Sequence, residues 1–192
     1  MVSARITLTS ESHLHEVEVR KATMSDIHAL LKLINSYAAD GIMLPRTEFE
    51  MSENIRDFSV AYLGSQLIGC GALHFYTPTS GEVRSLAVDP SLKAHGVGKL
   101  MMEALEVEAV DNHLHAIFAF TYVPEFFQKM GFQQVERGEL PLKVWKDCLR
   151  CPKFQCCDEI AMVKALRPHP VLTSTNVESE TGLIQLPNIK QL

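Results

Sequence analysis

The segment SLAVDPSLKAHGVGKL, residues 85–100, joins an apolar run to a glycine-spaced turn. The apolar residues predict a strand, the Asp-Pro step ends it, and the residues after the second glycine predict the start of a helix. A helix start leaves backbone N–H groups without helical partners and carries the positive end of the helix dipole. Gly96 and Gly98 lack the Cβ atom that would keep a bulky anion away, and Lys93 adds a positive charge. The segment therefore predicts a pyrophosphate site.

Two common nucleotide-binding motifs do not fit this turn. A Rossmann fingerprint needs G-x-G-x-x-G, and a P-loop needs G-x-x-x-x-G-K-[ST]. The hexapeptide KAHGVG resembles instead the acetyl-CoA pyrophosphate loop of the GNAT N-acetyltransferases, usually written Q/R-x-x-G-x-G/A. Lys93 stands where Gln or Arg is usual, and Ala94 stands where Gly is common. The plain alternative is a strand-to-helix connection that contains two glycines.

This resemblance implies that acetyl-CoA is the co-substrate and that it lies along the strand end, the loop and the first helical turn. The residues implied to contact it are Leu86, Ala87, Val88, Lys93, Ala94, His95, Gly96, Val97, Gly98 and Lys99.

The composition favours an ordinary globular protein. The 192 residues fit one domain, with 46% apolar and 21% charged residues. A net charge of -5 argues against nucleic-acid binding by general electrostatics. Residues 1–17 contain no apolar signal-peptide core, and no run reaches the 18 apolar residues or so of a membrane span. We therefore expect a cytoplasmic protein with neither nucleic acid nor membrane as a partner. A homodimer remains open.

Periodicity and turn signals predict the order of the elements. We expect a helix within 23–40, a short helix from Thr47 to about Asp57, antiparallel strands at 59–63, 67–75 and 82–88, a helix after the glycine loop, a strand at 114–121, a short helix between Pro124 and Gly131, and strands at 132–135 and 160–166. This order resembles that of a GNAT domain, a mixed α/β fold with a mostly antiparallel central sheet and helices on both faces. We expect an N-terminal extension over 1–16, the acetyltransferase domain over 17–166, and a tail over 167–192 that is mobile or packed as an arm.

Longer motifs point to a narrower group. The chain contains FFQKMGF at 126–132, IGCGALH at 68–74, GEVRSLAVDP at 81–90 and a basic residue, Arg46, after MLP. Together they resemble the short stand-alone bacterial N-acetylglutamate synthases. The resemblance implies acetyl transfer from acetyl-CoA to the α-amine of L-glutamate, the first step of arginine synthesis. One position departs from the family pattern, because Phe127 replaces a tyrosine that many members use to protonate the departing thiolate.

Two residues are candidates for moving protons. The ammonium group of an amino acid must lose a proton before it can attack a thioester. Glu82 begins the strand that leads to the loop, where GNAT enzymes often carry a catalytic carboxylate, and is the candidate base; a solvated charge is the alternative. Tyr122 lies five residues before Phe127 and could supply the proton in its place, or only pack near the site.

Two arginines are candidates for binding the acceptor. Arg84 is two residues after Glu82 and so shares its strand face; it could grip a substrate carboxylate as a two-pronged fork or neutralise Glu82. Arg46 follows the first helix, where GNAT enzymes bind their acceptor, and could bind a carboxylate or remain a surface charge. Both favour L-glutamate or a similar amino acid over a cationic polyamine. Other readings are a GNAT enzyme for another amine, such as another amino acid, a polyamine or a protein N-terminus, and a CoA-binding sensor without turnover.

Metal binding is not expected. Four of the five cysteines lie at positions 148, 151, 156 and 157, and this spacing has no second ligand pair to complete a zinc site. Cys70 has apolar neighbours and is expected to be a core residue. His74 and His95 have no motif partner that would assign them a role.

Overall fold

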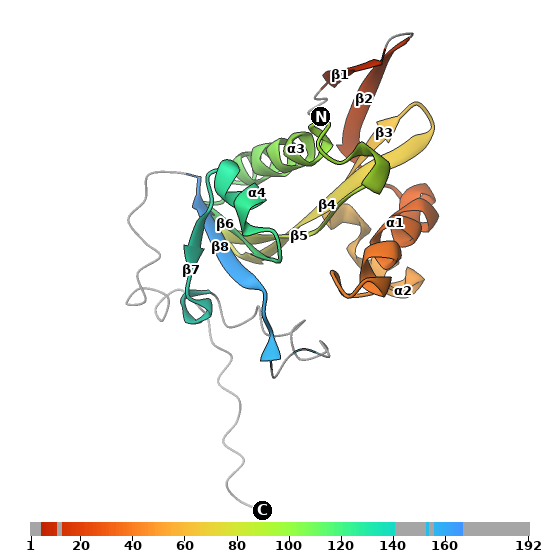
Figure 1. Cartoon of the computed structure of the whole chain (residues 1–192). Coiled ribbons are helices and arrows are strands. Elements are labelled where there is room, and N and C mark those ends of the chain that lie inside the picture. Colours follow the sequence, from red (N-terminus) through yellow and green to blue (C-terminus); the bar gives the residue numbers. More distant parts are fainter. Residues whose placement is uncertain (1–4, 11–12, 141–152, 154–155, 167–192) are drawn as a thin grey trace, which may run out of the picture.

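The computed structural model describes residues 5–10, 13–140, 153 and 156–166, and side chains from residue 17 onward. This part of the chain forms one eight-stranded sheet in the order β1-β2-β3-β4-β5-β6-β8-β7 (Figure 1). The strands are β1 Arg5–Ser10, β2 His13–Lys21, β3 Phe58–Leu63, β4 Gln66–Thr77, β5 Ser80–Val88, β6 Ala116–Thr121, β7 Gln133–Val135 and β8 Ile160–Ala165. Neighbouring strands are antiparallel except β5 and β6. The expected mixed α/β fold with a mostly antiparallel sheet is confirmed.

Helices cover both faces of the sheet (Figure 1). They are α1 Ile27–Ala39, α2 Glu48–Asn54, α3 Val97–Asp111 and α4 Pro124–Lys129, with 3-10 turns η1 Met24–Asp26, η2 Ile55–Asp57, η3 Pro90–Leu92 and η4 Arg137–Glu139. Helices α1 and α2 pack on β3, β4 and β5 through a core that includes Leu30, Met51 and Phe58. Helix α3 packs on the opposite face. No helix in the described ranges is long and apolar enough to cross a membrane.

Local sequence signals fix several element ends as expected. The short helix begins where expected, with Thr47 as its N-cap, and Thr47 and Glu50 form a capping box: the Glu50 N–H donates to Thr47 Oγ1 at 3.2 Å and the Thr47 N–H donates to Glu50 Oε2 at 3.0 Å. On α3, residues at four-residue steps form a buried stripe that consists of Val97, Met101, Leu105 and Ala109. Gly131 adopts a φ of 86° just past α4, a backbone conformation that glycine reaches at little cost.

Some boundaries differ from the expectation. The first helix is preceded by η1 and begins only at Ile27, and its buried residues are Ile27, Leu30, Ile34 and Tyr37. The strand expected from residue 114 begins at Ala116, because the N–H groups of residues 115 and 116 both donate to the Thr79 carbonyl. Residues 5–10, inside the expected N-terminal extension, form β1 and add an edge strand to β2.

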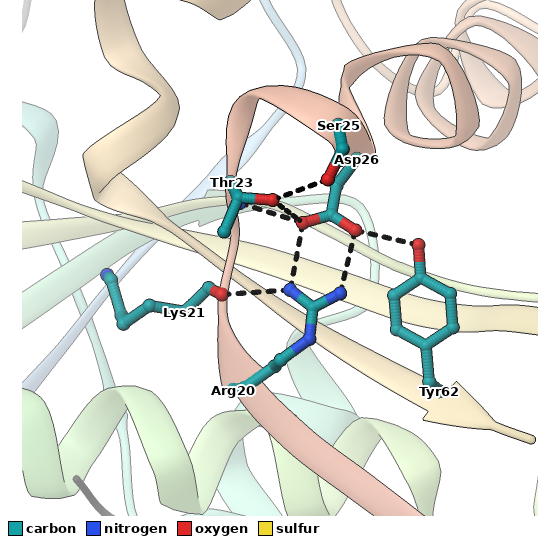
Figure 2. A network of polar contacts seen from close by, with 6 residues as sticks. All are labelled: Arg20, Lys21, Thr23, Ser25, Asp26 and Tyr62. Atoms are coloured by element: carbon teal, nitrogen blue, oxygen red, sulfur yellow. Dashed lines mark hydrogen bonds and ion pairs between the residues drawn. The ribbon is translucent and has the colours of Figure 1, made fainter. Parts of the chain in front are cut away.

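A buried carboxylate ties α1 to the sheet (Figure 2). Arg20 at the end of β2 donates two hydrogen bonds of 2.8 Å to Asp26, and the Tyr62 hydroxyl of β3 donates a third of 2.8 Å. The N–H of Thr23 adds a fourth at 2.7 Å. The Arg20 guanidinium therefore holds the pKa of the Asp26 carboxyl well below its usual range. This network fixes where α1 begins relative to β2 and β3.

Candidate active site

The two parallel strands separate in the middle of the sheet. Strands β5 and β6 pair only from Ser80 to Glu82, opposite Ala116 to Phe118. Beyond Glu82, β5 continues beside β4 and β6 continues beside β8. The glycine loop and α3 follow the end of β5, and α4 follows the end of β6. In open sheets with parallel strands, ligands bind outside the carboxyl ends of strands that diverge in this way.

A β-bulge interrupts β5 beside this separation. Arg84 lies opposite Ala72 and Ala87 lies opposite Cys70, so two residues of β5 oppose the single residue Gly71. One of these two, Ser85, adopts a φ of 53°. A bulge redirects backbone groups away from the ladder, and a redirected N–H is a candidate donor to an oxyanion. The sequence analysis missed this feature, because the bulge depends on the register between two strands.

The glycine loop has the backbone that the phosphate hypothesis needs. The first helical bond of α3 runs from the Leu100 N–H to the Gly96 carbonyl at 3.0 Å, so the N–H groups of Val97, Gly98 and Lys99 precede any helical acceptor. Gly96 has a φ of 86°, which turns the chain into the helix. The His95 N–H instead donates to the Leu92 carbonyl at 3.4 Å. The N–H groups of residues 97–99, and not that of His95, are therefore the candidate donors to an anion.

Ala94 shows why glycine is common at its position. Its φ of 68° lies in the left-handed region, which costs a residue with a Cβ atom roughly 1–2 kcal/mol. The loop therefore keeps its turn at some cost in stability.

The residues expected to contact acetyl-CoA differ in how far their side chains are exposed. The side chains of Ala87 and Val97 are buried in the core, so these residues can contribute only backbone groups. Gly98 lies against α4, because a Cβ atom there would be 3.4 Å from the Phe126 ring. Leu86 and Val88 are partly buried. Lys93 and Lys99 are exposed at the loop and the helix start.

A tyrosine of α1 connects the strand end to the loop. The Tyr37 hydroxyl donates to the Val88 carbonyl at 2.7 Å, and the Lys93 ammonium lies 5.0 Å from the centre of the Tyr37 ring. The sequence analysis did not identify Tyr37. The available signal was its spacing, because Tyr37 lies three residues after Ile34 on the buried face of the first helix.

The candidate base Glu82 and the candidate acceptor-binding residue Arg84 share the sheet face that α1 and α2 cover. Glu82 lies opposite His74, and Arg84 lies opposite Ala72, which belongs to the core under those helices. Arg84 is largely buried, and its Nη2 atom is 3.5 Å from Asp57 Oδ2 at the end of η2. Asp57 is thus a partner of Arg84 that neither sequence-based alternative included.

Asp57 also binds a histidine. The His74 Nδ1 atom lies 2.6 Å from Asp57 Oδ2, and the edge of the His74 ring meets Tyr76 at 5.0 Å between ring centroids. Seventeen positions separate Asp57 and His74, and antiparallel pairing of β3 with β4 brings them together. The sequence showed no partner for His74, and the structure supplies one.

The loop that carries Arg46 is clamped to α1. The Asn35 side chain accepts a hydrogen bond from the Arg46 N–H at 2.9 Å and donates one to the Arg46 carbonyl at 3.0 Å. The Arg46 side chain is partly buried. The residue is therefore held in place next to the helices that cover the Glu82 face.

The Tyr122 hydroxyl lies in a polar cluster at the end of β6. It donates to Asp158 Oδ1 at 3.0 Å and accepts from Lys153 Nζ at 3.1 Å. Burial, more than the hydrogen bonds, raises the pKa of Tyr122 above its usual value, so the hydroxyl keeps its proton at neutral pH. Phe127, at the position of the missing tyrosine, is buried and packs edge-on against Phe126 and Phe132.

The described residues contain no group of three or more His, Cys, Asp or Glu side chains that could hold a metal ion. Cys148 and Cys151 lie outside those residues. Cys156 is exposed, and the Cys157 thiol donates to Glu159 Oε2 at 3.7 Å.

Sequence comparisons place the chain among known proteins. Residues 26–132 match the model of the acetyltransferase (GNAT) family. An uncharacterised N-acetyltransferase of Chlorobaculum tepidum is 42% identical over 148 residues, covering 77% of this chain and 96% of that protein. An amino-acid acetyltransferase of Mycobacterium tuberculosis is 34% identical over 135 residues, covering 69% of this chain and 77% of that protein.

Solved structures show the same architecture. An N-acetylglutamate synthase from Neisseria gonorrhoeae, complexed with coenzyme A and N-acetyl-glutamate, superposes with a TM-score of 0.73 at 27% identity over 83% of this chain. The present chain spans only 36% of that longer protein. A Mycobacterium tuberculosis protein in complex with CoA superposes with a TM-score of 0.68 at 30% identity, covering 78% of this chain and 99% of that one.

Proposed function

This chain belongs to the acetyltransferase (GNAT) family, and we propose that this N-acetyltransferase transfers the acetyl group of acetyl-CoA to the α-amine of L-glutamate. The observation that carries the proposal is the position of Arg84. It is largely buried, on the sheet face that holds Glu82, at the point where the parallel strands separate. A guanidinium there matches a carboxylate-bearing acceptor. Relatives named amino-acid acetyltransferase, and the structure complexed with N-acetyl-glutamate, support the choice of glutamate.

Acetyl-CoA is proposed to bind along the end of β5 and the start of α3. The N–H groups of Val97, Gly98 and Lys99 would hold the pyrophosphate, with Lys93 as a neighbouring positive charge. This places the thioester near the bulge at Ser85 and Leu86, where a redirected backbone N–H would stabilise the oxyanion. An enzyme with a net charge of -5 depends on such local positive groups to bind an anionic ligand.

The proposed reaction needs four residues in three roles: a base, a proton donor and two carboxylate-binding arginines. Glu82 accepts a proton from the substrate ammonium, directly or through water, and the amine then attacks the thioester carbonyl. The C–N bond forms, the C–S bond breaks, and the thiolate leaves with a proton that Tyr122 can supply and then recover from the new amide nitrogen. Arg46 and Arg84 hold the two carboxylates of glutamate. The product would be N-acetylglutamate, the first intermediate of arginine synthesis.

The test is a thiol-release assay with acetyl-CoA across the free amino acids, with spermidine as a cationic acceptor. We expect glutamate to give the highest kcat/KM, glutamine a lower value, and spermidine no release above the background hydrolysis. Mass spectrometry of the product should show one acetyl group on glutamate. Equal efficiency with spermidine would contradict the proposal, because neither arginine would then have a carboxylate to bind.

A further inference from the structure

We propose that His74, oriented by Asp57, receives the proton that Glu82 takes from the substrate ammonium and passes it to solvent. The inference rests on the proposed function, since it concerns the proton released when an amino acid is acetylated. It assigns a catalytic proton-transfer role to the Asp57–His74 pair, two residues that no sequence motif connects.

The hydrogen bond to Asp57 determines which nitrogen of His74 can accept a proton. A carboxylate only accepts hydrogen bonds, so the Nδ1 atom, 2.6 Å from Asp57 Oδ2, carries the hydrogen. In the neutral ring, Nε2 is then the nitrogen with a free lone pair. The Asp57 carboxylate thus fixes the tautomer and the orientation of the ring, as an aspartate does for histidine in other enzymes.

The position of His74 connects it to the proposed base. His74 on β4 is the register partner of Glu82 on β5, and side chains of directly opposed residues have Cβ atoms roughly 5 Å apart. The two side chains therefore share one sheet face as neighbours. The His74 side chain is 31% exposed, so its proton can reach solvent. The edge contact with Tyr76 helps to hold the ring plane.

The proton count of the reaction requires a path from Glu82 to solvent, and His74 offers one. The acceptor enters as R–NH3+ and leaves as an amide, R–NH–CO–CH3. One of its protons goes to the departing sulfur as CoA–SH, and one is released in each turnover. If Glu82 kept that proton, it could not act as a base in the next turnover. Transfer from Glu82 to His74 Nε2, and from there to water, restores both groups.

Asp57 is a positioning residue with two partners. Besides His74 it lies 3.5 Å from the Nη2 atom of Arg84, the proposed carboxylate-binding arginine. Among the described residues, the charged and titratable groups that face His74 include Asp57 from η2 and Glu82 and Arg84 from β5, with Tyr76 on its own strand. Loss of the Asp57 carboxylate should affect both proton transfer, seen in kcat, and acceptor binding, seen in KM.

The experiment measures kcat and KM for glutamate and acetyl-CoA in a His74→Asn variant. An asparagine side chain can still donate an N–H to Asp57 but cannot relay a proton. We expect kcat to fall about 100-fold, within the usual range for loss of acid-base catalysis, while both KM values stay within about threefold. In His74→Ala, added imidazole should restore part of kcat and should not affect the wild type. The matched control is His28→Asn, an exposed histidine on α1, which should match the wild type.

Asp57→Asn separates the two roles of the carboxylate. It should lower kcat and raise the KM for glutamate, and the double variant with His74→Asn should have the same kcat as His74→Asn alone. A wild-type kcat in His74→Asn, or no response of His74→Ala to imidazole, would overturn the inference. If the wild type acetylates another amine instead of glutamate, the proposed acceptor is wrong. The same variants then test His74 with that amine.

Discussion

At the scale of single residues, lysine substitutions of Arg46 and Arg84 should show whether binding of the acceptor carboxylates needs only a positive charge or also the two-point geometry of a guanidinium. Substituting Lys keeps the positive charge but loses the two-point contact with a carboxylate. If one such contact contributes about 2 kcal/mol, kcat/KM for glutamate should fall roughly thirtyfold in either variant while the Kd for acetyl-CoA is unchanged. Arg56→Lys, at an exposed position on η2, is the control. Full efficiency in both site variants would remove the arginines from the acceptor site.

Cys70 should resist thiol reagents in the folded protein. Its side chain is fully buried, and burial raises the pKa of its thiol to about 12, so almost no thiolate forms near neutral pH. With iodoacetamide at pH 8 we expect modification of the exposed Cys156 and none of Cys70, followed by modification of Cys70 in denaturant. Peptide mapping by mass spectrometry gives the result. Equal rates at both cysteines in the native protein would show that the core around Cys70 opens readily.

Asp26 should contribute stability that persists until strongly acidic pH. Its pKa is lowered in the folded state, chiefly by the Arg20 hydrogen bond, so its contribution is complete above the unfolded-state pKa of about 4. As pH falls through the lowered folded-state value, the contribution is lost. We expect Asp26→Asn to lower the free energy of unfolding by about 2 kcal/mol at pH 7.

Urea denaturation at several pH values measures this difference. The gap between wild type and Asp26→Asn should be constant from pH 5 to 8 and should shrink below about pH 4. The exposed Glu53→Gln on α2 should stay within about 0.5 kcal/mol of the wild type. A gap that widens in acid would mean that the Arg20–Asp26 network does not stabilise the folded state.

At the scale of elements, two glycines at the start of α3 should behave differently. Gly98→Ala places a Cβ atom 3.4 Å from the Phe126 ring and 3.7 Å from Val88, which are ordinary contacts. The fold should tolerate it, but the methyl group reduces the room beside the N–H groups, and acetyl-CoA affinity should fall about tenfold. Gly96→Ala should instead lower the Tm, because a φ of 86° strains any residue with a Cβ atom.

Calorimetric titration with acetyl-CoA and thermal denaturation separate these effects. Gly138→Ala is the control, since a Cβ atom there meets nothing within 4 Å and the position lies outside the loop. An unchanged Kd in a folded Gly98→Ala variant would refute the assignment of the helix start as the pyrophosphate site.

At the scale of the whole molecule, β8 should be the last element that the domain needs in order to fold. This strand pairs with both β6 and β7, and the Leu166 N–H donates to the His115 carbonyl. A chain that ends after Leu166 should keep the Tm within a few degrees and kcat within about threefold of the full chain. A chain that ends after Glu159 loses β8 and should not fold cooperatively. Loss of activity in the first truncation would assign a role in the site to residues 167–192.

Much of this architecture was predictable because it depends on neighbours in sequence. The Thr47–Glu50 capping box, the buried stripe of α3 and the turn at Gly131 each arise within a few residues, where backbone preferences and helical periodicity dominate. The glycine loop belongs to the same class, because its conformation and its N–H groups are local properties. Likewise Glu82 and Arg84 share a sheet face by the two-residue period of a strand.

Only the tertiary structure showed which distant side chains meet. Asp57 reaches His74 and Arg84, and Tyr122 reaches Asp158, across 17, 27 and 36 positions. The bulge at Ser85 and the early separation of β5 from β6 likewise depend on strand register. The physical reason is that local preferences determine each element, whereas burial of apolar faces between elements determines strand order and register, and only these bring distant polar groups within hydrogen-bonding distance.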